Sequence, residues 1–60
     1  MPSPVRFAVV KKLLESKGYV LDRINSSHFI FKKPGQLDQS IPVHHNLVKH
    51  GYYRKAKKAL

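Results

Sequence analysis

The sequence predicts a small α+β domain in which two helices pack on one face of a three-stranded antiparallel sheet, in a fold like that of a double-stranded-RNA-binding domain. Apolar residues recur at helical spacing near the start of the chain, apolar and polar residues alternate through its middle, and a basic segment with helical spacing ends it. The predicted order is α-β-β-β-α, with residues 1–60 forming one domain. Helices on one side leave the other face of the sheet open to solvent.

The first helix is predicted in SPVRFAVVKKLLESKG, residues 3–18. Ser3 takes the N-cap, Pro4 the first helical position and Gly18 the position just past the last turn. Apolar side chains at helical spacing form the face that we expect to be buried: Phe7, Val10, Leu13 and Leu14.

The next two segments predict a β-hairpin. YVLDRI and HFIFKK both alternate apolar and polar residues, and NSS between them supplies turn chemistry. Because side chains alternate along a strand, Phe29 and Phe31 are expected to face the core. His28, Ile30 and Lys32 then lie on the open face.

A third strand and a second helix complete the prediction. The strand runs from Ser40 to Val43, and Pro42 within it indicates an edge strand or a strand end. The helix begins at about Gly51. Its apolar side is expected to carry Tyr53, Ala56 and Leu60, and the rest of its surface Arg54, Lys55, Lys57 and Lys58.

The charge balance points to a polyanionic partner. The chain has 12 Lys and Arg against 3 Asp and Glu, a net charge of +9. No apolar stretch approaches the roughly 20 residues that span a bilayer, and the start lacks signal-peptide features, so we expect a cytoplasmic protein. A basic helix without large aliphatic residues also argues against binding at a membrane surface. Having no cysteine excludes disulfides, thiolate nucleophiles and Cys-type zinc sites.

His28 is the main candidate for chemistry, although a strand histidine on an open face is often only a solvated polar residue. Imidazole exchanges protons near neutral pH, and the ribose 2′-hydroxyl of RNA is a nucleophile that needs only deprotonation. Lys32, Lys33 and Arg23 are expected to hold the phosphate and to stabilise charge developing on it.

The other histidines are weaker candidates. His44 is either a helper to His28, an RNA contact or an ordinary loop residue. Adjacent histidines on an extended segment point apart, and no carboxylate or cysteine completes a ligand set for His44, His45 and His50. We therefore expect no metal site and no cofactor.

The basic terminal helix has two readings. It is either a solvated helix surface or a surface that contacts phosphates through Arg54 and Lys55. Four cations in this segment, with no acidic residue among them, favour phosphate contact. Tyr52 and Tyr53 could stack on unpaired bases, although the spacing of Tyr53 favours the core.

Short motifs are distributed through LDRINSSHFIFKKP and IPVHHNLVKHGYYRKAKKAL. A serine-histidine pair opens the second strand, an aromatic follows three residues later, Pro-x-His closes the third strand, and Leu-x-x-x-Gly starts the last helix. From about Leu13 to Leu60 this pattern resembles the HicA (YcfA-like) toxins of bacterial HicAB toxin-antitoxin pairs. The residues that carry the resemblance are Ser27, His28, Phe31, Pro42, His44, Leu47 and Gly51.

The resemblance implies the double-stranded-RNA-binding-domain fold, ribosome-independent cleavage of messenger RNA with His28 as the catalytic residue, and neutralisation by a HicB-like antitoxin that covers the active face. We accordingly predict a metal-independent endoribonuclease, monomeric when free, with RNA and the antitoxin as partners and no membrane. Ser27, next to His28, joins the predicted RNA contacts. The alternative is a non-catalytic RNA-binding module of the same fold, favoured by Ser26 where the family usually has glycine.

Overall fold

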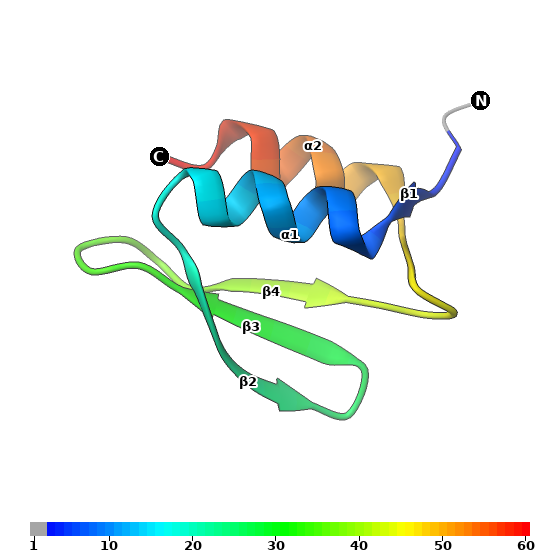
Figure 1. Cartoon of the computed structure of the whole chain (residues 1–60), viewed down its shortest axis with the longest axis horizontal. Coiled ribbons are helices and arrows are strands. Elements are labelled where there is room, and N and C mark those ends of the chain that lie inside the picture. Colours follow the sequence, from blue (N-terminus) through cyan, green and yellow to red (C-terminus); the bar gives the residue numbers. More distant parts are fainter. Residues whose placement is uncertain (1–2) are drawn as a thin grey trace.

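A computed structural model describes residues 3–60 and confirms the α+β plan. Two helices lie side by side over one face of a three-stranded antiparallel sheet of order β2-β3-β4 (Figure 1). A separate ribbon of two short strands, β1 and β5, was not predicted. The elements are β1 Val5–Arg6, α1 Phe7–Ser16, β2 Val20–Asn25, β3 His28–Lys32, β4 Gln39–Pro42, β5 Leu47–Val48 and α2 His50–Lys58.

The predicted start of the first helix is wrong. Ser3 and Pro4 lie outside α1, which begins at Phe7 with Arg6 as its N-cap. The residues just before the helix, Val5 and Arg6, instead pair antiparallel with β5. Tertiary pairing of this kind can outweigh a local capping signal, because an N-cap side chain contributes only about 0.5 to 2 kcal/mol.

The predicted end of the same helix is confirmed. Gly18 has a φ of 93°, in the left-handed region that glycine enters without steric cost. Its N–H donates to the Glu15 carbonyl at 3.0 Å, and the Tyr19 N–H donates to the Leu14 carbonyl at 3.0 Å. These two bonds form a Schellman motif, and the buried side chains of Leu14 and Tyr19 complete it.

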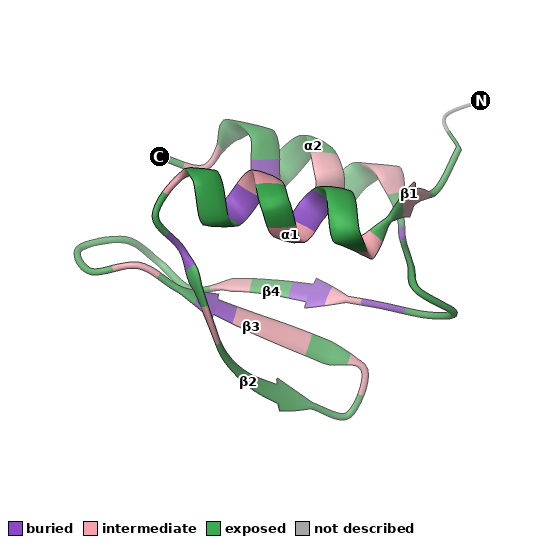
Figure 2. Ribbon diagram, in the orientation of Figure 1, coloured by how far each residue is buried: buried purple, intermediate pink, exposed green. Residues whose placement is uncertain are grey.

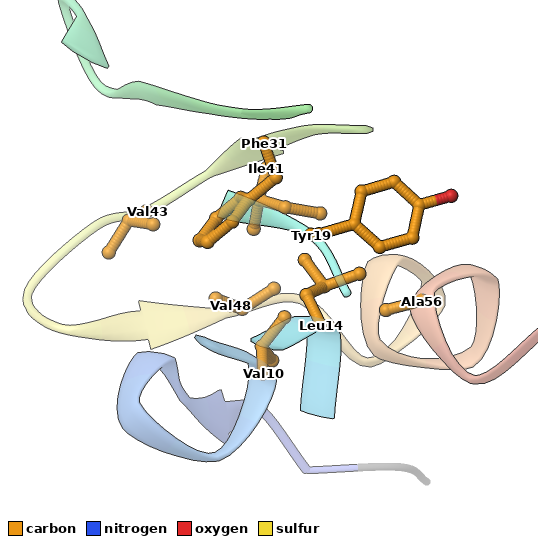
Figure 3. Close-up of a cluster of buried hydrophobic side chains, with 8 residues drawn as sticks. All are labelled: Val10, Leu14, Tyr19, Phe31, Ile41, Val43, Val48 and Ala56. Atoms are coloured by element: carbon orange, nitrogen blue, oxygen red, sulfur yellow. The ribbon is translucent and has the colours of Figure 1, made fainter. Parts of the chain in front are cut away.

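The core fills the space between the helices and the sheet. Figure 2 shows that buried residues occur in both the helices and the sheet, and Figure 3 shows the side chains that meet between them. Phe31 is fully buried at the centre of β3, while His28 and Lys32 on the same strand are exposed, so the predicted alternation is confirmed. The core residues are Val10, Leu14, Tyr19, Phe31, Ile41, Val43, Val48 and Ala56.

An irregularity in β2 sets which of its residues face the helices. The pairing register shifts between Leu21, opposite Phe31, and Arg23, opposite Ile30. Asp22 is thus the extra residue of a bulge, which bends a strand and changes the direction of its side chains. Because residues opposite each other share a face, Arg23 lies on the open face with Ile30.

The β2-β3 turn holds a serine in a backbone conformation that favours glycine. Ser26 has a φ of 57°, and it connects strands whose last paired residues are Asn25 and His28. We predict that Ser26→Gly raises the melting temperature by about 2 to 6 °C, because the left-handed conformation costs a non-glycine residue roughly 1 kcal/mol. Ser27→Gly, at a position whose φ is not positive, is the control and is expected to lower it. Thermal unfolding followed by circular dichroism measures both, and a lower melting temperature for Ser26→Gly would contradict the prediction.

The second helix starts one position before the predicted Gly51 and does not bury all of its predicted apolar side. Ala56 is fully buried, and Tyr53 is half-buried. Leu60 is 77% exposed, so its predicted place on the apolar side is wrong. The reason is that α2 ends at Lys58 and Ala59 is extended, with φ −63° and ψ 142°, which takes the chain off the helical path.

Candidate functional site

A cleft opens where the start of β3, the end of β4 and the start of α2 meet. Its volume is about 410 Å³. It brings His28 together with His44, which sequence reasoning could place only near the same face. The residues that line it are Pro4, His28, Pro42, His44, Leu47, Val48, Lys49 and Tyr52.

His28 is the first residue of β3, and its backbone is held on both sides. Asn25 lies opposite it on β2 and Pro42 on β4. The preceding Ser27 accepts a hydrogen bond through its carbonyl from the Val43 N–H at 2.8 Å. The His28 side chain itself is exposed. The fold therefore fixes the position of the His28 backbone and leaves the imidazole ring accessible at the mouth of the cleft.

His44 is positioned by a tight turn that was expected to be extended. Its N–H donates to the Leu47 carbonyl at 3.0 Å, and the Leu47 N–H donates back to the His44 carbonyl at 2.8 Å. The two residues between, His45 and Asn46, have φ of 53° and 63°. Positive φ at both central residues is typical of a type I′ turn. Here His44 lines the cleft, whereas His45 lines a different hollow of about 440 Å³ beside Arg6.

Lys49 is a cation of the cleft that sequence analysis did not single out. It is the N-cap of α2, with φ −60° and ψ 140°, and it is exposed. The helix was predicted to begin at about Gly51, so Lys49 fell outside the predicted elements. The only signal in the sequence is its place just before a basic helix, two residues ahead of the predicted Gly51.

The start of α2 adds further positive potential to the cleft. No side chain caps the first turn of α2 by a hydrogen bond, and this turn has no acidic residue. The first N–H groups of a helix carry a partial positive charge and favour anions. With Lys49 next to them, they make this wall of the cleft attractive to a phosphate group.

The helix α1 repeats this arrangement at the same end of the molecule. Its N-cap is Arg6, again without a side-chain capping bond and without an acid in the first turn. Both helices begin at the end that carries β1, and they run in the same direction (Figure 1). The start of α1, however, lines the other hollow through Arg6 and Phe7, and the Phe7 N–H donates to the Asn46 carbonyl at 2.8 Å, so its positive end does not belong to the cleft.

None of the three cations predicted to surround His28 lines the cleft. Lys32 lies on the same face but ends the strand that His28 begins, which at roughly 3.3 Å per residue separates them by about 13 Å. Arg23 is on β2 and pairs with the Asp22 carboxylate at 2.7 Å. Lys33 is turned toward the helices, where its Nζ donates to the Leu60 carbonyl at 2.9 Å and lies 5.6 Å from the centre of the Tyr19 ring.

The cations of α2 are exposed along the helix beyond Tyr52. Arg54 and Lys55 both face solvent. Lys55 belongs to the last turn, together with Lys57 and Lys58, where positive charge stabilises the helix end. Lys57 also lies 5.0 Å from the centre of the Tyr53 ring. Part of this basic surface therefore has a structural role of its own.

Residues 3–60 show neither a cluster of metal-ligating side chains nor a membrane-spanning helix. No group of three or more His, Cys, Asp or Glu side chains lies close enough to hold a metal ion. Within the same residues, neither helix has the length and apolar character needed to cross a membrane.

Comparison with known protein families identifies a match over nearly the whole chain. The family described as "HicA toxin of bacterial toxin-antitoxin" has a sequence model that matches residues 8–60, nearly the whole chain. No curated protein and no solved structure matches the chain.

Proposed function

The chain belongs to the HicA toxin family of bacterial toxin-antitoxin systems, and from this premise we propose that it is a metal-independent endoribonuclease that cleaves messenger RNA. The observation that carries the proposal is one cleft lined by His28, His44 and Lys49. Two imidazoles supply a proton acceptor and a proton donor near neutral pH, and the ammonium group supplies a positive charge for the phosphate.

The proposed reaction uses the RNA as its own nucleophile. Neutral His28 accepts the proton of the ribose 2′-hydroxyl, and the resulting oxyanion attacks the adjacent phosphorus. The bond from phosphorus to the 5′-oxygen breaks, and protonated His44 donates its proton to that leaving oxygen. Lys49 stabilises the negative charge that develops on the phosphoryl oxygens. The products are a 2′,3′-cyclic phosphate and a 5′-hydroxyl.

The other exposed cations fit neighbouring phosphates better than the scissile one. Lys32 and Arg23 lie on the open sheet face away from the cleft, and Arg54 and Lys55 follow the cleft along α2. In this proposal they bind the RNA backbone on either side of the cleavage position. Lys33 takes no part, because its ammonium group is already engaged beside Tyr19 and the Leu60 carbonyl.

The Ser26 position bears on the alternative of a non-catalytic RNA-binding module. The absence of the family glycine favoured that alternative. With a φ of 57°, however, Ser26 takes the backbone conformation that a glycine at this place would supply. The turn that presents His28 is thus compatible with serine, which supports the catalytic proposal.

Incubation of the purified protein with end-labelled RNA in excess EDTA tests this function. We expect cleavage products that end in a 2′,3′-cyclic phosphate, because no step requires a metal ion. Tight binding without product would favour the non-catalytic module. Products that form only after Mg²⁺ is added would contradict the histidine mechanism.

Family membership implies an antitoxin partner. We propose that it is a HicB-like protein that covers the cleft with an acidic surface, since the toxin carries a net charge of +9. Before this complex forms, the toxin is proposed to be a monomer. Size-exclusion chromatography with light scattering tests the monomer, and protection of RNA by added antitoxin tests the covered cleft.

The role of Lys49 can be measured through the salt dependence of RNA binding. Lys49→Ala is expected to reduce the slope of log affinity against log salt by about 0.7, which corresponds to one lost phosphate contact on single-stranded RNA. The control is Lys12→Ala, which removes the same charge from an exposed position of α1. Equal slopes for the two variants would show that Lys49 contributes only net charge.

A further inference from the structure

The walls of the cleft are more apolar than phosphate binding requires. His28, His44 and Lys49 provide the polar groups. The remaining lining consists of two prolines, two aliphatic side chains and one aromatic ring: Pro4, Pro42, Leu47, Val48 and Tyr52. A phosphate needs cations and N–H groups, so the apolar walls indicate that a second, uncharged part of the ligand enters.

The volume of the cleft limits what this part can be. About 410 Å³ lies within the range of sites that enclose a small molecule, roughly 300 to 1,000 Å³. A flat heterocycle with its sugar is a ligand of this class. A duplex is not, because its bases are paired and stacked inside the helix, and the narrow major groove of A-form RNA admits no side chains to them.

Tyr52 is placed to supply a stacking surface. Its N–H donates to the Lys49 carbonyl at 3.0 Å, so it belongs to the same first turn of α2 as the phosphate-binding wall. Its side chain is half-buried and packs against the core. A ring held in this way loses little conformational freedom when a ligand stacks on it. Stacking on aromatic side chains is also the usual way in which unpaired bases are bound.

We propose that the cleft binds one unpaired nucleobase, stacked on Tyr52, next to the phosphate that Lys49 contacts. The substrate is therefore single-stranded or looped RNA, although the fold resembles domains that bind duplex RNA by its shape. This inference rests on the proposed function for its choice of RNA as the ligand. It adds the strandedness of the substrate and a base-binding role for Tyr52.

Equilibrium binding tests the inference apart from catalysis. The protein carries His28→Ala so that the RNA stays intact, and the probe is a fluorescein-labelled 12-nucleotide RNA, either alone or annealed to its complement. We expect the duplex to bind at least about tenfold more weakly than the single strand. A series of the same RNA with one abasic nucleotide at successive positions is expected to lose affinity mainly at one position.

Two substitutions of Tyr52 distinguish stacking by an aromatic ring from packing by an apolar side chain. Tyr52→Phe keeps the ring and is expected to bind within about twofold of the parent, whereas Tyr52→Leu keeps an apolar side chain and is expected to bind about 5- to 100-fold more weakly. Circular dichroism melting checks the fold of each variant. If Tyr52→Leu does not fold, the duplex comparison and the abasic series still decide, because neither changes Tyr52.

Several outcomes would overturn the inference. Equal affinity for duplex and single strand would show that the cleft binds no unpaired base. The same conclusion would follow from an even loss across the abasic series or from unchanged affinity of a folded Tyr52→Leu. The apolar walls would then be assigned to contact with a protein partner. None of them depends on RNA cleavage. A protein that fails to cleave but shows the expected binding would contradict the proposed function alone.

Discussion

Replacing His28 by alanine is expected to lower the rate of RNA cleavage at least about a hundredfold and to leave RNA affinity within about twofold. The rate falls because the proposed proton acceptor for the 2′-hydroxyl is lost. Affinity is kept because the cations along the open face and α2 remain, and the His28 ring contributes no charge when it is neutral. Single-turnover cleavage of labelled RNA and fluorescence anisotropy measure the two quantities.

His45 provides a matched control on the same molecule. It is also an exposed histidine close to the cleft, but it lines the other hollow. His45→Asn is a suitable substitution because asparagine tolerates the left-handed conformation that His45 adopts, with φ 53°. We expect its cleavage rate to stay within about twofold of the parent. Equal losses in His28→Ala and His45→Asn would contradict a specific role for His28.

Local patterns predicted those parts of the fold whose cause is local. The alternation in HFIFKK placed Phe31 in the core because side chains along one strand alternate whatever lies around them. Gly18 marked the end of α1 because its left-handed conformation is a property of that residue. The β1-β5 ribbon has no such signal. Two residues in each strand are too few for a period, and the pairing joins opposite parts of the chain.

The residues of the candidate site could be predicted from the sequence in part, but their arrangement could not. His28 and His44 could be selected from the chemistry of their side chains. That both line one cleft with Lys49 depends on the turn at His45 and Asn46 and on the true start of α2. The turn is local but carries no glycine to mark it, and the convergence of β3, β4 and α2 on one cleft is a long-range feature, so the sequence did not predict the site as a whole.

Lys33 lies differently from what its position beside Lys32 suggested. As the neighbour of Lys32 it was expected to share a phosphate. It lies just beyond the end of β3, where the chain leaves the sheet and its ammonium group reaches the helices. The two adjacent lysines therefore face different parts of the molecule, which residue type alone could not predict.

The largest effect on stability is expected from Phe31→Ala. Phe31 is fully buried, and it lies between Leu21 of β2 and Gln39 of β4 in the central strand. Its ring is also 6.3 Å from that of Phe7 on α1. Truncating a buried phenylalanine costs about 3 to 5 kcal/mol of unfolding free energy, because apolar contacts are lost and a cavity remains.

This loss is comparable with the whole stability of the domain. At roughly 0.05 to 0.15 kcal/mol per residue, a chain of 60 residues has an unfolding free energy of about 3 to 9 kcal/mol. Phe31→Ala is thus expected to be largely unfolded at 25 °C or to unfold at a much lower urea concentration, as followed by circular dichroism. Leu37→Ala, at a position 86% exposed, is the control and is expected to unfold like the parent. Similar urea midpoints for the two variants would show that Phe31 is not the centre of the core. Because His28 begins the same strand, loss of this core is also expected to abolish the cleft and with it RNA cleavage.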